Sequence, residues 1–367
     1  MMAFSPNQFA MTKLPDTLTS KRLTFLVIVA LIMCLDIPNL NAQVLMIPKI
    51  SKPWSEALRL VGDGHTLYSD FTLIKDKLGS WHCIGTFGKA PGSKSNGYAL
   101  KDGYALFHAV GSSLSKPMRL LRKIHYQIKS PTAYMWSPMA IWNKKRTTAY
   151  LYYFHYFGSS ADTGNCARLL VSTSPDLSVW RPYSGKGLRE QNMVFRERDD
   201  RDFCVFWDKQ LDEYLMYYAC AGTYPGMKGL QTIDRVRTST DLLHWSNPIT
   251  VMGPPPGYGC AESPFVLFRD GYYYLWVSGC DYSRVSVYVS KNPFNFGDPA
   301  RNRIEEMPGH APKIVEDDGR YYMACSMIST VPSKIPAAHN LDGVFIQPLQ
   351  WIPATKQIEK RVVTSKP

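Results

Sequence analysis

Short runs of apolar and aromatic residues, each bounded by turn residues, dominate the chain from about residue 60 onward. Most of these runs are rich in β-branched or aromatic residues and end at Gly, Pro or Asp, and few segments show a sustained helical period. Runs of this length and composition are typical of β-strands. The segment CAESPFVLFRDGYYYLWVSG at 260–279 is one example, with two strands joined by a turn at 269–271. The pattern predicts an all-β chain.

An aromatic strand that follows a turn occurs five times, which indicates an internal repeat. Successive copies lie 69, 64, 59 and 49 residues apart when marked at Trp81, Tyr150, Tyr214, Tyr273 and Tyr322. Repeats of this size, each with about four short strands, predict a five-bladed β-propeller over residues 60–345. Stacking the blades around an axis covers faces that a single blade would leave exposed. A β-sandwich or two small β domains is the alternative.

In every copy, an apolar strand begins 11 or 12 residues before the aromatic marker. The residues at these starts are Asp70, Pro138, Asp202, Glu262 and His310. Because innermost propeller strands run along the central channel, we expect these positions to converge at one mouth of it. Carboxylates crowded in one pocket have pKa values that move apart, so that one stays ionised while another holds a proton. Hydrolysis of a glycosidic bond needs such a pair.

These motifs also resemble the five-bladed β-propeller glycoside hydrolases of family 43, in the superfamily that includes families 32 and 68. AESPFVLFRDGYYYLWVS is similar to the family 43 strand of the general acid, which implies that Glu262 is the proton donor. SDFTLIKDKLGSWHCIGT resembles the strand of the catalytic base or nucleophile, implying Asp70, and RDFCVFWDKQLDEYLMYY resembles the strand of a third acid that tunes the donor, implying Asp202. Asp63, Asp208 and the acidic run at 197–200 are the competing carboxylates.

The resemblance extends to aromatic and ion-binding positions. MWSPMAIW is similar to the Trp-Ala-Pro motif of the second blade, which implies that Trp136 stacks on a sugar ring. GHAPKIVEDDGRYYM is similar to the fifth-blade strand whose histidine faces a central ion, which implies His310 as a substrate contact or as a ligand of a structural calcium ion. No other cofactor is expected. The further candidates for substrate binding are Phe71, Trp207 and Arg284.

Some motif positions depart from the families. Phe71 stands where family 43 has Pro after the first Asp, and Ser263 stands where it has Gly in Glu-Gly-Pro. The nucleophile motif and C-terminal β-sandwich of family 32 are both missing from the sequence. The resemblance therefore leaves open the stereochemical outcome, because family 43 inverts and family 32 retains the anomeric configuration.

The chain carries a formal net charge of +12, with its basic residues scattered rather than in blocks. This predicts a basic soluble surface, which is compatible with an acidic or sulfated glycan and gives no reason to expect a nucleic-acid partner. The sequence therefore predicts a glycoside hydrolase similar to arabinofuranosidases and xylosidases. The alternatives are a non-catalytic carbohydrate-binding propeller, a family 32-like fructosidase, a propeller phosphorylase and a protein-interaction propeller.

The N-terminus has the layout of a secretory signal. Lys21-Arg22 precede an apolar run at 23–35, and small and polar residues follow up to Ala42. The run is shorter than the roughly 20 residues that span a membrane, so membrane attachment is expected only if this segment stays uncleaved. The predicted organisation is a signal peptide at 1–42, a lead-in at 43–59, the catalytic propeller at 60–345 and a tail at 346–367 that could close a blade.

We therefore expect a secreted or periplasmic protein. A bacterial source is expected because the chain has no Asn-x-Ser/Thr site for glycosylation. Seven of the eight cysteines would remain after cleavage, and none has zinc-binding spacing. Export permits disulfides, and Cys260 with Cys280 could bridge a hairpin.

Overall fold

The computed structural model describes residues 44–63, 66–89, 105–125, 134–156, 167–184, 193–195, 200–226, 228–327 and 343–359. Contacts divide the chain into the segment Met1–Val44 and the unit Leu45–Pro367. The predicted signal peptide at 1–42 lies outside the described residues. Within the described ranges, no helix has the length and apolar character needed to cross a membrane.

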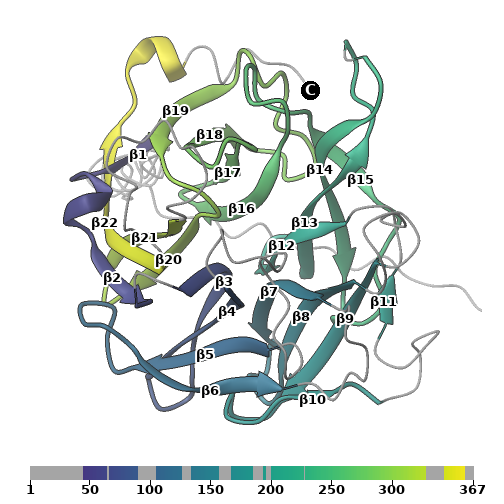
Figure 1. Cartoon of the computed structure of the whole chain (residues 1–367). Helices are drawn as coiled ribbons and strands as arrows, with labels where there is room; N and C mark the ends of the chain where they lie inside the picture. Colours follow the sequence, from purple (N-terminus) through teal and green to yellow (C-terminus); the bar gives the residue numbers. More distant parts are fainter. Residues whose placement is uncertain are drawn as a thin grey trace, which may run out of the picture. The chain divides into compact units, whose positions relative to one another are not determined.

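The unit Leu45–Pro367 contains five antiparallel sheets, which surround a common centre as the blades of a propeller (Figure 1). Blade one contains β3 (Thr66–Lys75), β4 (Trp81–Lys89), β5 (Ala105–Gly111) and β6 (Arg119–His125). Blade two contains β7 (Tyr134–Trp142), β8 (Ala149–Tyr156), β9 (Ala167–Ser174), β10 (Arg181–Pro182) and β11 (Met193–Phe195). Blade three contains β12 (Arg201–Asp208), β13 (Glu213–Gly222), β14 (Gln231–Ser239) and β15 (Ile249–Met252).

Blade four contains β16 (Glu262–Arg269), β17 (Tyr272–Ser278), β18 (Arg284–Ser290) and β19 (Arg303–Pro308). Blade five contains β20 (Lys313–Asp317), β21 (Arg320–Met327), β22 (Gly343–Pro353), β1 (Met46–Ile50) and β2 (Leu58–Val61). A short 3₁₀ turn, η1 (Trp54–Glu56), connects β1 to β2. The strands β3, β7, β12, β16 and β20 lie innermost, around the centre of the view (Figure 1). The predicted five-bladed all-β propeller is thus confirmed.

Blade five joins the two ends of the described chain. The C-terminal strand β22 pairs with β21 on one side, and with β1 and β2 from the N-terminal part of the unit on the other. The propeller therefore extends beyond 60–345 at both ends, because the segments expected as lead-in and tail supply strands of this blade. Backbone hydrogen bonds close the ring and leave fewer strand edges open to pairing with other chains.

Each junction between neighbouring blades has its own hydrophobic cluster. The cluster between blades four and five includes Tyr274 and Trp276, and every residue of β17 is buried. Aromatic and β-branched residues suit such a strand because both of its faces pack against other side chains. Five clusters in a closed ring explain why the aromatic strands of the repeat recur once per blade.

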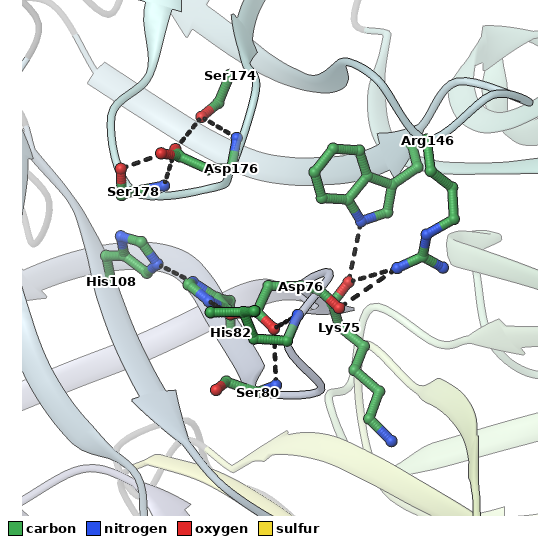
Figure 2. Close-up of polar contacts among 11 residues, drawn as sticks. Lys75, Asp76, Ser80, His82, His108, Arg146, Ser174, Asp176 and Ser178 are labelled. Carbon is green, nitrogen blue, oxygen red and sulfur yellow. Dashed lines mark hydrogen bonds and ion pairs between the residues drawn. The ribbon is translucent and has the colours of Figure 1, made fainter.

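The turns that follow β3 and β9 are held by side chains that bond to the backbone (Figure 2). The carboxylate of Asp76, which follows β3, accepts hydrogen bonds from the backbone N–H groups of Leu78 and Ser80, both at 2.8 Å. Its other oxygen lies 3.3 Å from Nε2 of His82, whose Nδ1 lies 2.8 Å from Nε2 of the buried His108. Such side-chain caps fix a turn by satisfying backbone donors.

Candidate active site

Four innermost strands have a local distortion in their first half, and the fifth has one just before it begins. Single left-handed residues occur at Asp70 (φ 39°), Ser137 (φ 50°), Asp202 (φ 60°) and Ser263 (φ 51°), each where the pairing register shifts, and at Ala311 (φ 47°) just before β20. Residues other than glycine rarely adopt this conformation. An extra residue in a strand bends it and re-aims a side chain, and such bulges are common beside active sites. The five distortions mark one equivalent position per blade.

The distorted positions correct the alignment of the five repeats that was predicted from the sequence. Of the five positions predicted to be equivalent, Asp70 and Asp202 occupy the distorted position, whereas Glu262 and His310 lie one residue before it and Pro138 lies one residue after it. Glu262 is therefore equivalent to Arg201 rather than to Asp202. Counting back from the aromatic markers gave the wrong register because the intervening turns differ in length. Two residues separate the strand partners Arg269 and Tyr272, whereas five separate Lys75 and Trp81.

The distorted positions surround a small central cavity. It is lined by Asp70, Phe71, Ser137, Pro138, Asp202, Phe203, Ser263, Ala311 and Lys313. Two of the three predicted acids, Asp70 from blade one and Asp202 from blade three, thus share one cavity. Glu262 precedes the lining residue Ser263 in blade four.

Asp202 is fixed by bonds from both neighbouring blades. The hydroxyl of Ser137 donates to Oδ1 at 2.6 Å, and the backbone N–H of Ser263 donates to Oδ2 at 3.1 Å. Ser263, the donor of the second bond, is itself one of the left-handed residues. A carboxylate held by two donors from separate blades has a well-defined position.

Glu262 pairs with an arginine from the next blade. Nη2 of Arg201 donates to Oε1 of Glu262 at 2.7 Å, and Nε of the same guanidinium lies 3.7 Å from Oδ2 of Asp202. The side chains of Arg201 and Glu262 are only 19% and 12% exposed, so water screens this pair weakly. An adjacent guanidinium favours the ionised form of a carboxylate. Arg201 was not predicted as a site residue, although its place beside Asp202 at the strand start was a usable signal.

The electrostatics of Asp70 differ from those of a surface aspartate. Burial is the largest cause that raises the pKa of Asp70 to about 7, and the charge of Asp202 raises it further. Lys313 and Arg201 oppose this rise, while Glu262 adds to it. Near neutral pH, Asp70 can therefore exchange a proton, which suits a general acid or base.

A buried acid beside the site escaped the sequence analysis. Asp234 of β14 pairs across the sheet with Ala219, which on its other side pairs with Arg201. Asp234 is fully buried, and neither of its carboxyl oxygens has a hydrogen-bond partner in the described structure. Burial, followed by the charge of Asp202, raises the pKa of Asp234 well above its usual value. The signal in the sequence was a lone aspartate in the strand QTIDRVRTS.

His310 and its surroundings do not fit a calcium site. Calcium prefers six to eight oxygen ligands. His310 is buried, and its Nδ1 has no hydrogen-bond partner among the described residues. Burial is the main cause that lowers the pKa of His310 to about 4, which leaves the imidazole neutral, and the nearby Lys313 lowers it further. Tyr282 covers the ring at a centroid distance of 4.3 Å. An imidazole with an ammonium group close by is a poor donor set for a hard cation.

The predicted disulfide is confirmed between Cys260 and Cys280, with a Cα–Cα distance of 5.8 Å. It lies beside the candidate acid, since both sulfur atoms are within 4.8 Å of a carboxylate oxygen of Glu262. The bridge links the residue two positions before Glu262 to the loop that follows β17. It therefore ties the backbone just before Glu262 to the end of the strand that pairs with Glu262.

The remaining predicted residues divide between the two ends of the strands. Trp136 lies level with Glu262 in its own blade and stacks on Phe154 at 5.7 Å. Arg284 begins β18, where its guanidinium bonds to Asp281 at 3.0 Å and stacks on Tyr258. Ser278 links Arg284 to the site end, because it pairs with Glu262 and with the neighbouring Val285.

Phe71 and Trp207 have other surroundings. Phe71 is fully buried in the cluster between blades one and five and forms part of the cavity wall. Trp207 lies near the end of β12, next to the turn and under the ammonium of Lys144 at 4.4 Å, so it is not gathered with Asp202.

The competing carboxylates have other contacts. Asp208 accepts a hydrogen bond from the hydroxyl of Tyr273 at 2.6 Å and caps the turn that follows β12. Asp63 is exposed and precedes β3. Of the run at 197–200, only Asp200 lies within the described residues, and it is buried. None of these three lines the central cavity.

Solved structures share this architecture at low sequence identity. One is an exo-1,5-α-L-arabinanase from a bovine ruminal metagenomic library, which has a TM-score of 0.52 and 15% identity and covers 82% of this chain and 98% of its own. The RS223-β-xylosidase has a TM-score of 0.56 and 16% identity, over 83% of this chain and 97% of its own. The GH43_1 enzyme from Xanthomonas citri complexed with xylotriose has a TM-score of 0.55 and 15% identity, over 82% of this chain and 92% of its own.

No protein-family model and no curated protein sequence matches the chain. At about 15% identity, the likeness to the solved structures concerns the fold. The chain thus has the five-bladed propeller fold of family 43 arabinanases and xylosidases, with Asp70 and Asp202 lining its central cavity.

Proposed function

We propose that the protein is a glycoside hydrolase that cleaves arabinose- or xylose-containing oligo- or polysaccharides. The observation that carries this proposal is the shared central cavity of Asp70 and Asp202, with Glu262 on the adjoining strand of blade four. The names of the solved neighbours guide the choice of sugars, since they include arabinanases and a xylosidase. A purely sugar-binding propeller would not need three carboxylates at its centre.

In this mechanism, Glu262 protonates the leaving oxygen while Asp70 acts at the anomeric carbon, as a base on water or as a nucleophile. Asp202, which is fixed by Ser137 and the Ser263 amide, orients the sugar. Its negative charge also favours the protonated form of the nearby Asp70 carboxyl group. For Glu262 to donate a proton, Arg201 must first release it. A sugar hydroxyl that accepts the hydrogen bond of Arg201 in place of Glu262 would allow this.

The Arg201–Glu262 pair also favours a second assignment of roles. A carboxylate beside a guanidinium is a better base or nucleophile than acid, and Asp70, with a pKa of about 7, can hold a proton. In this version, Asp70 donates the proton and Glu262 acts at the anomeric carbon. The reaction is the same in both versions, and only the roles are exchanged.

The first experiment tests the reaction itself. Wild type, Glu262→Gln and Asp70→Asn are incubated with arabinan, xylan, sulfated glycans and fructans, with and without phosphate, and products are separated by chromatography. We expect wild type to release sugars and each variant to lose about 10²–10⁴-fold in kcat/KM. Equal release by wild type and both variants would contradict the proposal, as would binding of a glycan without turnover. Phosphate-dependent release would identify a phosphorylase.

The second experiment assigns the roles. Aryl glycosides with good leaving groups need no protonation, so they restore activity to a variant that lacks the general acid but not to one that lacks the base or nucleophile. Restoration in Glu262→Gln alone supports the first assignment, and restoration in Asp70→Asn alone supports the exchanged one. Proton NMR of the first product then gives the anomeric configuration.

We also propose that the protein is exported from the cell that makes it. The disulfide between Cys260 and Cys280 supports this, because disulfides persist in oxidising compartments and are rare in the cytosol. The test is fractionation of expressing cells together with N-terminal sequencing. A processed chain that begins near residue 43 is expected, and an unprocessed cytosolic chain would contradict export.

A further inference from the structure

The central cavity contains a buried lysine that neither the sequence motifs nor the proposed mechanism uses. Lys313 begins β20, is only 6% exposed, and lines the cavity together with Asp70 and Asp202. Within the described residues, its ammonium forms no direct hydrogen bond or ion pair. Its Nζ lies 5.8 Å from the centroid of the Phe265 ring. A buried ammonium group is strongly unfavourable unless opposite charge compensates it.

Compensation comes from groups across the cavity. Burial lowers the pKa of Lys313, while the Cys204 thiol and the carboxylates of Asp202 and Asp70 raise it, followed by the Cys325 thiol. The interaction is mutual, since Lys313 lowers the pKa of Asp70. The buried thiols are not charged near neutral pH, because burial raises the pKa of Cys204 to about 11 and that of Cys325 further still. Asp70 and Asp202 are therefore the counter-charges of Lys313.

Lys313 also differs from the other cation near Asp70. The groups that act on Asp70 are Asp202 and Glu262, which favour its protonated form, and Lys313 and Arg201, which favour its ionised form. Arg201 is already bound to Glu262 at 2.7 Å. Lys313 has no such direct partner among the described residues, and its charge acts on both Asp70 and Asp202. His310, the predicted calcium ligand, is neutral and lies close enough for Lys313 to influence it.

We propose that Lys313 is the resident cation of the central cavity, that its ammonium favours the ionised form of Asp70 against the acids around it, and that it takes the place of a bound calcium ion. Lys313 is thus a positioning residue for Asp70, not a group that contacts the reacting atoms. Its importance for catalysis rests on the proposed glycosidase function, but its effect on the charge of Asp70 does not. A calcium ion placed beside an ammonium in this small cavity would be repelled.

The test follows the ionisation of Asp70 directly. Aspartate carboxyl carbons are labelled with ¹³C in the full chain and titrated by NMR, and the Asp70 signal is identified by its loss in Asp70→Asn. Wild type is expected to titrate near pH 7, as its pKa of about 7 requires. In Lys313→Met, which keeps a similar length without charge, the midpoint should rise by about one pH unit or more. Lys313→Arg, the matched control, should keep the wild-type midpoint.

An unchanged midpoint in folded Lys313→Met would overturn the proposal, as would an equal rise in Lys313→Arg. A second measurement needs only wild type and so does not depend on the folding of a variant. Calorimetric titration with calcium is expected to show no binding, and chelation should change neither the thermal midpoint nor the Asp70 titration. A stoichiometric calcium ion whose removal shifts either quantity would overturn the replacement of calcium by Lys313.

The two proposals can fail independently. If no glycan is cleaved while the Asp70 midpoint responds to Lys313 as described, the glycosidase function fails and the role of Lys313 stands. If glycans are cleaved and the midpoint does not respond, the reverse holds. For an active protein, the limb of the kcat/KM profile that Asp70 controls, which is the acid limb if Asp70 is the base or nucleophile and the alkaline limb if it is the acid, should move with the NMR midpoint in all three forms.

Discussion

Two aspartates on the same hairpin show how differently the two ends of a blade are built. Asp70 lies at the central cavity, where burial raises its pKa to about 7. Asp76 lies at the other end of β3, in the turn shown in Figure 2. Burial alone would raise the pKa of Asp76, but hydrogen bonds from Ser80, His82 and Leu78 outweigh it and lower the pKa below its usual value.

The same contrast extends to other blades. At the site end, Asp234 and His310 have buried polar atoms without a hydrogen-bond partner in the described structure. At the turn end, Asp176 accepts bonds from the backbone and hydroxyl of Ser178, and Asp208 caps the turn after β12. Buried polar groups left unpaired reduce stability and tend to persist where they serve a function. The contrast concerns carboxylates and imidazoles, since the indole N–H of Trp81, next to the Asp76 turn, also has no hydrogen-bond partner in the described structure. For carboxylates and imidazoles, the contrast associates stability with the turn end and chemistry with the site end.

The largest expected effect separates the two ends by activity. Asp70→Asn should lower kcat/KM by about 10²–10⁴-fold, because it removes a proton-transfer group or nucleophile. Asp76→Asn should leave kcat/KM close to that of wild type, since Asp76 lies at the opposite end of β3. Initial rates on the glycan found active in the first screen provide the measurement. A comparable loss in both variants would mean that the comparison of the two ends is wrong.

The next effect concerns the covalent link at the site end. Replacing both Cys260 and Cys280 by serine should lower the free energy of unfolding by about 3 kcal/mol. The reason is that the bridge joins residues with a sequence separation of 20 and so restricts the unfolded chain. Urea denaturation followed by tryptophan fluorescence measures this loss. Reduction of wild type by dithiothreitol should reproduce it, whereas the double variant should not respond to the reductant. A response of the variant would point to another cysteine.

A smaller effect is expected at the turn end. Asp76→Ala leaves the N–H groups of Leu78 and Ser80 and the His82 ring without their acceptor, and should lower the free energy of unfolding by about 1–3 kcal/mol. Asp318→Asn, in the exposed turn between β20 and β21, is the control and should change it less, because asparagine tolerates the left-handed backbone of this residue (φ 50°). Urea denaturation of both variants gives the comparison. A larger loss for the control would contradict the role of the Asp76 cap.

The sequence was sufficient for the repeat, because one aromatic strand per blade has to fill each junction between blades. It was insufficient for the register, because hairpin turns of different length hide which residue sits at each bulge. Lys313 and Asp234 were missed because a lone polar residue in an apolar strand gives no indication of which face it occupies. Trp207 was assigned to the site because closeness in sequence does not show that it lies at the other end of its strand.

The last prediction concerns the most gradual effect, the pH dependence of the free energy of unfolding at the two ends of the blade. Between the unfolded value of 3.8 and the folded value of about 7, Asp70 keeps its proton in the folded state and loses it in the unfolded state. The unfolded state then binds fewer protons, so stability falls as pH rises through this window, by up to about 1.4 kcal/mol per pH unit from this group. Asp76 has the opposite sign, because its pKa is lowered on folding. Its contribution is present above the unfolded value and is lost as pH falls below it.

Urea denaturation of wild type, Asp70→Asn and Asp76→Asn at intervals from pH 3 to 8 separates the two contributions. The stability of Asp70→Asn relative to wild type should increase steadily from pH 4 to 7 and then level off. The deficit of Asp76→Asn should be constant over that range and shrink only below about pH 4, where the wild-type carboxylate is protonated as well. If the two difference curves had the same sign and shape, the carboxylates would not be in opposite environments. The division between a chemical end and a stabilising end of the blade would then lose its electrostatic basis.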